Sequence, residues 1–86
     1  MRYPYFAKNL KALRVINKLS QEQLAEKIHV SPAAISNWEA GYITPRRSSL
    51  LRLSFCFGED LEDILYESKK YVAEAEKIAG NPLNAT

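Results

Sequence analysis

The chain has 86 residues, of which 47% are apolar and 26% charged, a composition typical of one soluble domain. No run approaches the roughly 18 consecutive apolar residues of a membrane span, and no charged start followed by an apolar run marks a secretory signal. The single cysteine, Cys56, excludes an internal disulfide, so we expect a reducing, cytoplasmic location. Within the apolar run "FCF", Cys56 is interpreted as a small filler of the core.

Charge is distributed unevenly along the chain. Residues 1–57 carry nine lysines and arginines against three glutamates, a balance of +6, whereas residues 58–86 carry three lysines against seven carboxylates, a balance of −4. A basic half of this kind favours a surface that faces a polyanion such as nucleic acid. Solvated surface charge without a partner is the alternative, and charge alone does not separate the two.

Helical periodicity runs through the chain, and no sustained alternation of apolar and polar residues indicates a strand, so an all-α fold is predicted. Pro4 suits the first position of the first helix, whose pattern fades near Asn17 and Lys18. Apolar side chains recur along this helix at the spacing of one buried stripe, made of Phe6, Leu10 and Leu13.

The next two predicted helices are short and separated by almost nothing. Ser20 is a good N-cap for the first of them, and Gln23 three residues later completes a capping box. Ser31 caps the second, with Pro32 at its first position, and Gly41 suits a left-handed stop after a helix that covers about residues 31–40. The side chains expected to point inward from this pair are Leu24, Ala25, Ile28, Ile35 and Trp38.

A fourth helix is expected to start at Thr44-Pro45, with Arg46 or Ser48 as alternative caps, and to end at Gly58. Its candidate core residues are Leu50, Leu51, Leu53 and Phe57.

Asp60 is expected to open a fifth helix, which either stops near Tyr66 or continues to a firm end at Gly80. A continuous helix would align one apolar stripe of Leu61, Ile64, Leu65, Val72, Ala75 and Ala79. That stripe either covers the chain's own core or contacts a second copy, and the sequence leaves both open.

Two short helices that meet at a tight turn, here at His29-Val30, form a helix-turn-helix, in which small Ala25 lets the two helices approach closely. The chain resembles the XRE-type family of phage-repressor and Cro-like helix-turn-helix regulators over about residues 10–65. The resemblance rests on "LKALR", "LSQEQLAEKI", "VSPAAISNWEAG", "TP" and "LLRLSFCFGEDLEDIL", in that order and at the family's spacing.

Two positions depart from the family's pattern. His29 stands where the family usually has glycine in the turn, so we expect a histidine with positive φ at some cost in strain. Lys18 stands where the family often has glycine after the first helix, and Asn17 is expected to supply the left-handed residue instead. His29 is the only histidine, so we interpret it as a turn residue and expect no metal or other cofactor.

The resemblance implies a five-helix, lambda-repressor-like DNA-binding domain over residues 1–66 and a helical extension with a frayed end over residues 67–86. It implies a bacterial or phage-encoded transcriptional regulator, repressor-like, that binds double-stranded DNA as a homodimer. The dimer contact is expected on the extension side of the molecule, at Leu61, Ile64, Leu65 and Val72. The acidic C-terminal helix is an expected contact surface for another protein partner.

The resemblance also assigns roles to individual residues. Arg14 and Glu39 match a pair that braces the third helix. The positions that face base edges are Pro32, Ala33, Ser36 and Asn37, of which Asn37 is the best candidate for specific reading because a carboxamide pairs bidentately with adenine. The positions that contact the phosphate backbone are Gln21, Tyr42, Thr44, Arg46 and Arg47.

A second function class fits the same residues. A protein-interaction module such as an antitoxin or adaptor could retain the fold, and the sparse polar groups at the base-facing positions leave this alternative open. An enzyme is not expected, because the sequence offers no nucleophile–base pair, glycine-rich phosphate loop or metal cluster. The acidic residues Asp60, Glu62 and Asp63 lie at a helix start, where carboxylates favour the helix dipole.

Overall fold

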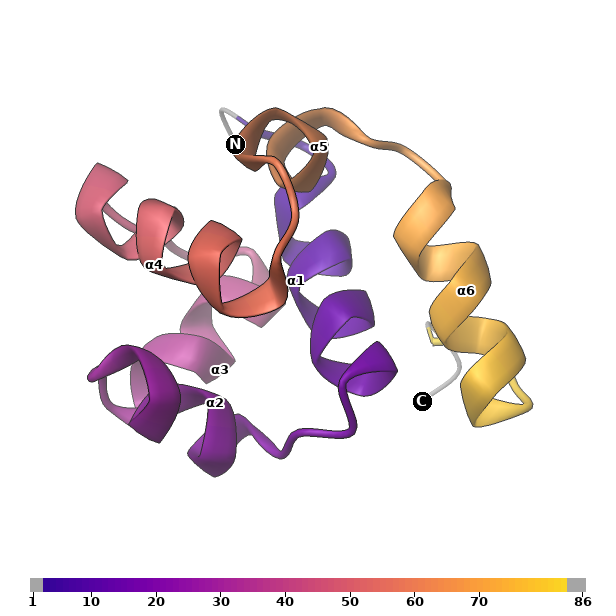
Figure 1. The fold of residues 1–86 in the computed structure, drawn as a ribbon, viewed down its shortest axis with the longest axis horizontal. Coiled ribbons are helices and arrows are strands. Elements are labelled where there is room, and N and C mark those ends of the chain that lie inside the picture. Colours follow the sequence, from indigo (N-terminus) through magenta and orange to yellow (C-terminus); the bar gives the residue numbers. More distant parts are fainter. Residues whose placement is uncertain (1–2, 84–86) are drawn as a thin grey trace.

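The computed structural model describes residues 3–83, and over this range the chain is all-α, with six helices and no strand. Figure 1 shows α1 at the centre, with α6 on one side and α2, α3 and α4 on the other. The helices are α1 (Phe6–Ile16), α2 (Gln21–Ile28), α3 (Pro32–Ala40), α4 (Arg47–Phe57), α5 (Leu61–Tyr66) and α6 (Lys70–Ala79).

The core forms where α1 contacts α3, α5 and α6, and where α2 contacts α3 and α4. The predicted stripe of the first helix is confirmed, because Phe6, Leu10 and Leu13 are all buried. Leu51 was wrongly expected in the core, since it lies on the outer face of α4 and is 48% exposed. The largest completely buried apolar side chains come from five of the helices and are Phe6, Leu10, Leu24, Ile35, Leu53 and Ile64.

Both serine caps are confirmed. The Ser20 hydroxyl accepts a hydrogen bond from the Gln23 backbone N–H at 3.0 Å, and the Gln23 side-chain oxygen accepts one from the Ser20 N–H at 2.8 Å. The Ser31 hydroxyl accepts from the Ala34 N–H at 3.1 Å. These bonds use N–H groups that the first turn of a helix otherwise leaves unpaired, so they fix where α2 and α3 begin.

Left-handed residues end the helices largely as predicted. His29 has φ 61° and Gly41 has φ 83°, which confirms both stops. The expectation for the end of α1 was wrong: Lys18 has φ 57° and Asn17 has φ −88°. The Asn17 amide donates to the Leu13 carbonyl oxygen at 2.7 Å, so Asn17 satisfies the end of the helix and the next residue makes the turn.

Two helices start after the proline that was expected to open them. The Phe6 N–H donates to the Tyr3 carbonyl at 3.2 Å, so Pro4 lies in a turn and α1 begins only at Phe6. For α4 the start at Thr44-Pro45 is wrong and the alternative cap Arg46 is confirmed, although the Arg46 side chain makes no capping hydrogen bond. Arg46 itself adopts extended backbone, with ψ 163°, so α4 begins only after it.

The fifth helix stops at Tyr66, which is one of the two predicted alternatives, and the described residues up to Tyr66 form five helices, as expected. The extension forms a separate helix, α6, so the alternative of one continuous helix is wrong. The cause lies in α1. The buried amide of Asn9 donates to the carbonyl oxygens of Ile64 at 2.9 Å and Glu67 at 2.7 Å. These two bonds hold the carbonyls where the chain leaves α5, and Glu67 adopts extended backbone.

The apolar residues of α5 and α6 cover the chain's own core. Ile64 is 0% exposed and Leu65 is 7% exposed, so neither is available as a dimer contact, contrary to expectation. Leu61 and Val72 are half-buried and pack against the same core. The break after α5 gives α6 its own direction, so the predicted single stripe does not exist.

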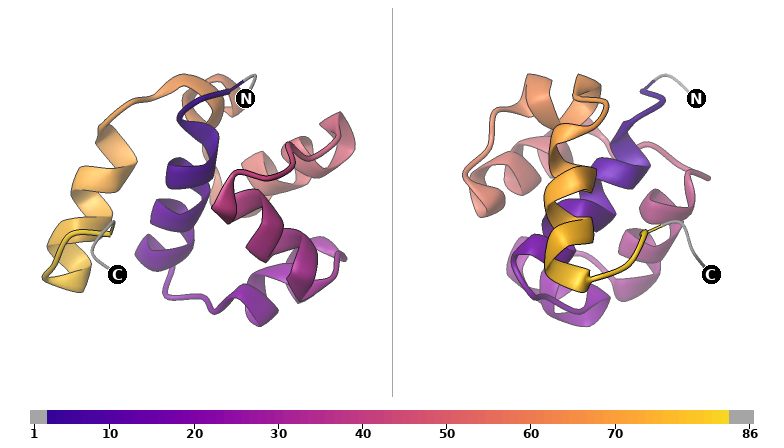
Figure 2. Two further views of the ribbon diagram at one scale, coloured as in Figure 1. Left: turned by 180° about the vertical axis from the view of Figure 1, so that it is seen from behind. Right: turned by 90° about the vertical axis from the view of Figure 1, so that its right-hand side faces the viewer.

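Helix α6 docks against α1, as both views in Figure 2 show. Tyr71 and Ala75 are the buried residues of α6, and the Tyr71 hydroxyl donates to the Glu59 carboxylate at 2.8 Å. Burial raises the pKa of Tyr71, and the bond to Glu59 raises it further, so the hydroxyl keeps its proton. The extension is therefore an integral part of the described fold.

We predict that Asn9→Ala lowers the free energy of unfolding by about 2 kcal/mol, because two carbonyls in a buried region lose their donor. Urea denaturation measures this loss. Asn17→Ala is the matched control, since Asn17 lies on the same helix but is exposed and bonds only its own last turn. Equal losses for the two variants would contradict the role assigned to Asn9.

Candidate nucleic-acid interface

Helices α2 and α3 meet through a single tight turn. Ala25 is 1% exposed at their contact, and its carbonyl oxygen accepts a hydrogen bond from the Val30 N–H at 3.0 Å. Arg52 of α4 donates to the carbonyl oxygen of Ile28, the last residue of α2, at 3.1 Å. These bonds pair carbonyls that the end of a helix leaves free, so the angle between α2 and α3 is fixed from both sides.

An ion pair joins the first helix to the end of the third. Arg14 Nε donates to Glu39 Oε2 at 2.6 Å, and Arg14 Nη2 donates to Glu39 Oε1 at 3.0 Å. The two side chains are only 15% and 6% exposed. A two-pronged bond between planar groups is directional, so it fixes both the position and the rotation of α3. The ion pair implied by the family resemblance is therefore present.

Gln21, at the start of α2, completes this cluster. Its side-chain amide donates to Glu39 Oε1 at 3.1 Å, and Arg14 Nη1 donates to the Leu19 carbonyl at 2.9 Å. Gln21 is half-buried, so its side chain is held against Glu39 at the start of α2. The start of α2 and the end of α3 thus share one set of hydrogen bonds, made by Arg14, Gln21 and Glu39, which we call the Arg14–Glu39 cluster.

The outer face of α3 is open. Pro32, Ala33 and Ser36 are exposed and Asn37 is half-buried, while Ile35 and Trp38 turn inward to the core. The four outer residues are the predicted base-facing set, and they lie together on one side of the helix. Figure 2 shows α3 at the front in the view from behind, with α4 farther from the viewer.

The loop that follows α3 is exposed along most of its length. Tyr42 is 80% exposed, Arg46 and Arg47 are exposed, and Thr44 is half-buried. Buried Pro45 anchors this loop to the core. The predicted phosphate-contacting residues therefore lie on a loop and a helix start that are fixed at both ends.

Ile43 was missed in the sequence reading. It lies in the same loop and is 54% exposed. An isolated apolar residue between two polar loop residues is a weak signal, because single exposed apolar side chains are common on protein surfaces. Its position between Tyr42 and Thr44 makes it a further candidate for contact with DNA.

The electrostatics of this surface suit an anion. None of the nine predicted contact residues is acidic, and Arg46 and Arg47 are cationic. The starts of α2 and α3 present the positive ends of two helix dipoles. Within residues 3–83 no group of His, Cys, Asp and Glu is arranged to hold a metal ion. Over the same range no helix has both the length and the apolar character needed to cross a bilayer.

The braced pair of helices and the exposed outer face of α3 define a helix-turn-helix DNA-binding domain. The family model described as helix-turn-helix matches residues 10–64. The chain belongs to this XRE-type family of DNA-binding transcriptional regulators. Regulators of this family are not typically enzymes.

Two proteins are similar to the chain in sequence. The chain is 42% identical over 60 residues to the HTH-type transcriptional activator BcrR of Enterococcus faecalis, across 70% of this chain and 29% of BcrR. It is 29% identical over 80 residues to the uncharacterized HTH-type transcriptional regulator YqaE of Bacillus subtilis (strain 168), across 90% of this chain and 69% of YqaE. The chain thus spans less than a third of the length of BcrR.

The structural comparison agrees with the family assignment. The solution structure of the SOS-response transcriptional repressor LexA from Eubacterium rectale matches with a TM-score of 0.72 and 28% sequence identity. The match covers 80% of this chain and 72% of that chain. The prediction of a phage-repressor type of fold is thereby confirmed.

We predict that Arg14 and Glu39 are strongly coupled. Glu39→Met should lower the free energy of unfolding by about 3 kcal/mol, because it leaves the guanidinium of Arg14 without its partner. The double variant Arg14→Met/Glu39→Met should lose less than the sum of the single losses, by about 1–3 kcal/mol. Urea denaturation of the parent chain, the two single variants and the double variant measures this coupling as a double-mutant cycle.

Lys77 and Glu74 form the control pair for this cycle, since both are exposed on α6. The losses in free energy of unfolding of the single variants at Lys77 and Glu74 should add, to within about 0.5 kcal/mol, to the loss of the double variant. Additive losses at Arg14 and Glu39 as well would contradict the bracing role of the ion pair.

Proposed function

We propose that the protein is a sequence-specific regulator that places α3 in the major groove of double-stranded DNA as a homodimer. The observation that carries this proposal is the open outer face of α3, held by the Arg14–Glu39 cluster and flanked by Gln21 and the loop of residues 41–47. A rigid helix with an exposed N-terminal half is what major-groove reading requires.

Base reading rests mainly on Asn37. Its carboxamide has a donor and an acceptor side by side, which match N6 and N7 of adenine. Ser36 can bond a base or a phosphate, whereas Pro32 and Ala33 offer only apolar contact, as to a thymine methyl. With so few polar groups on α3, part of the specificity comes from the shape and deformability of the DNA.

Phosphate contacts flank α3 on both sides. Gln21 lies at the start of α2, where backbone N–H groups point outward and suit a phosphate oxygen. On the other side, the hydroxyls of Tyr42 and Thr44 and the guanidinium groups of Arg46 and Arg47 follow the reading helix. These contacts position the helix on the duplex and supply most of the salt-dependent affinity.

The dimer follows from the small number of base pairs that one helix-turn-helix reads. Two copies related by a two-fold axis would place half-site centres about 34 Å apart, one turn of the duplex. Partly exposed Leu61 lies beside Tyr66, which is 58% exposed, and both line a depression that also includes Tyr3 and Arg47. This depression is next to the phosphate-contacting loop, so we propose it as the contact between copies.

Repression is the proposed direction of regulation. A dimer bound across a promoter excludes other proteins from the same DNA and needs only affinity for its site. The structural relative LexA is named a repressor. The relative BcrR is named an activator, and activation by this chain would require a contact with a further protein.

We predict that selection from random duplex DNA, followed by sequencing, enriches a two-fold site. Asn37→Ala should remove about 1–3 kcal/mol of discrimination at one position in each half-site, because the paired carboxamide is lost. Arg47→Ala should weaken binding to all sequences alike and reduce the salt dependence by about one phosphate per copy.

Lys77→Ala is the matched control for Arg47→Ala, since Lys77 is an exposed cation on α6, away from the reading face. It should leave both affinity and salt dependence unchanged. Failure to enrich any sequence, or an enriched site that Asn37→Ala reads equally well, would overturn the assignment of α3 as the reading helix.

A further inference from the structure

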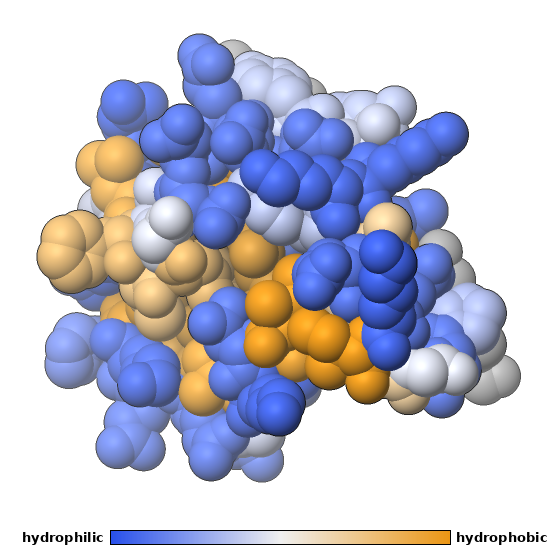
Figure 3. All heavy atoms as spheres, turned by 45° about the vertical axis from the view of Figure 1, so that its right-hand side comes forward, coloured by the Kyte–Doolittle hydropathy of each residue, from blue (hydrophilic) through white to orange (hydrophobic). Residues whose placement is uncertain are grey.

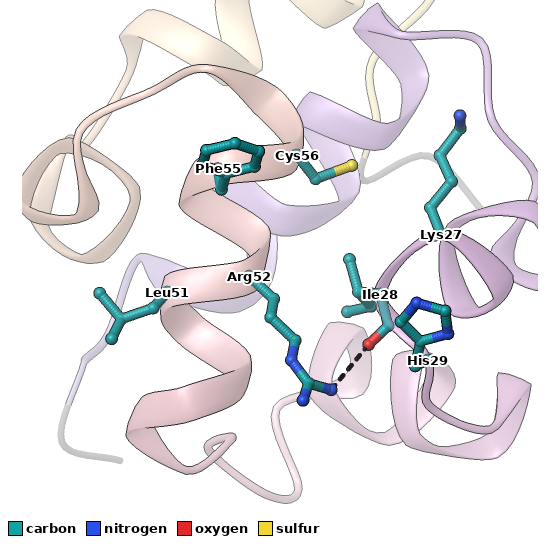
Figure 4. Close-up of a pocket in the computed structure, with 7 residues that line it drawn as sticks. All are labelled: Lys27, Ile28, His29, Leu51, Arg52, Phe55 and Cys56. Carbon is teal, nitrogen blue, oxygen red and sulfur yellow. Dashed lines mark hydrogen bonds between the residues drawn. The ribbon is translucent and has the colours of Figure 1, made fainter.

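An open groove of about 580 Å³ separates the end of α2 from the C-terminal half of α4. Figure 4 shows Arg52 and Cys56 of α4 on the side of Lys27, Ile28 and His29, and the ring of Phe55 in front of α4. None of its lining residues belongs to α3 or to the loop of residues 41–47. The groove is therefore separate from the proposed DNA-contacting surface.

Phe55 is the most exposed large apolar side chain in the described part of the chain, at 91%. Cys56, next to it, is half-buried. In Figure 3 apolar atoms come to the surface in separate areas among hydrophilic side chains. Solvent-exposed aromatic side chains next to a groove are enriched at protein–protein interfaces. Where no partner covers them, they lower the solubility of the protein.

Charge in the groove has one sign. Lys27 and Arg52 line it with His29, and no carboxylate is among its lining residues. Arg52 Nη1 donates to the Ile28 carbonyl, which fixes the guanidinium in the groove and leaves further N–H donors open. The groove thus combines apolar surface from Ile28 and Phe55 with fixed positive charge.

We propose that this groove binds an acidic, amphipathic helical segment of another protein. The apolar face of such a segment would cover Phe55, Cys56 and Ile28, and its carboxylates would meet Lys27 and Arg52. Helix-in-groove binding needs this combination of an apolar surface and a charged rim. Bound to DNA through α3, the regulator would bring that partner to its operator.

Two other occupants fit less well. A second copy would offer α6, where exposed Lys70, Glu74 and Lys77 lie on the same helix as Ile78. This helix carries both signs of charge, so it complements the groove less well than an acidic segment does. Duplex DNA offers charge but no apolar surface to cover Phe55. Both occupants give distinct results in the experiment below.

The test uses amide NMR of the ¹⁵N-labelled chain with a synthetic helical peptide of about 15 residues, long enough to hold a helix. The peptide carries leucines at i, i+3, i+4 and i+7 and glutamates elsewhere. A second peptide has lysine in place of every glutamate. We expect saturable shifts at residues 27–29 and 52–56 with the acidic peptide only.

Phe55→Ala should weaken the acidic peptide at least about tenfold, as expected for an anchor residue. Lys27→Glu should weaken it too and reduce its salt dependence. Ile78→Ala, which removes a smaller and 44% exposed apolar side chain on α6, should leave the affinity unchanged. Phe55 is exposed and lies outside the DNA-contacting set, so Phe55→Ala should also fold and bind duplex DNA like the parent chain.

Several results would overturn the proposal. They are absence of saturable binding, equal binding of the two peptides, and shifts that map to other residues. Concentration-dependent self-association in sedimentation that Phe55→Ala abolishes would assign the groove to a second copy. Loss of DNA affinity in Phe55→Ala would assign it to DNA. Because peptide and DNA binding are measured separately, failure here leaves the proposed regulator function standing.

Discussion

The bond between Arg14 and Glu39 is the constraint on which the rest of the molecule depends. It joins the first helix to the end of the third, with Nε and Nη2 of one guanidinium on the two oxygens of one carboxylate. Gln21 adds the start of α2 to the same carboxylate. Three helices are therefore joined at the nearly buried Glu39 carboxylate. Replacing either Arg14 or Glu39 alone leaves the charge of the other unpaired. The orientation of α3, and with it any reading of DNA, follows from this point.

The opposite face of α1 carries a second constraint. Asn9 reaches the end of α5 and stops that helix, which lets the chain turn back and lay α6 along α1. Tyr71 and its bond to Glu59 then connect α6 to the turn after α4. The first helix thus organises the molecule on both sides: one face positions α3, and the other positions α6 away from it.

The features that the sequence predicts well are those set by neighbours in the chain. Ser20 and Ser31 cap their helices through hydrogen bonds to the backbone three residues later. His29 adopts the left-handed conformation at the end of α2. The break after Tyr66 was one of two predicted alternatives, and neighbouring residues could not decide between them, because Asn9 imposes the break from 55 residues away. The DNA-contacting set came from family resemblance, and its contact roles remain predictions. The groove beside Phe55 was invisible in the sequence, since it needs the two helices side by side.

The most direct test of this account is amide NMR of the full chain with its selected duplex. We expect the largest shifts on the start of α2, on residues 31–37 and on the loop of residues 41–47, while α6 stays unchanged. In Arg14→Met the shifts on α3 should weaken although the residues that touch DNA are all present. Shifts concentrated on α6 or on the groove between α2 and α4, with α3 silent, would contradict the claim that a braced α3 reads the DNA.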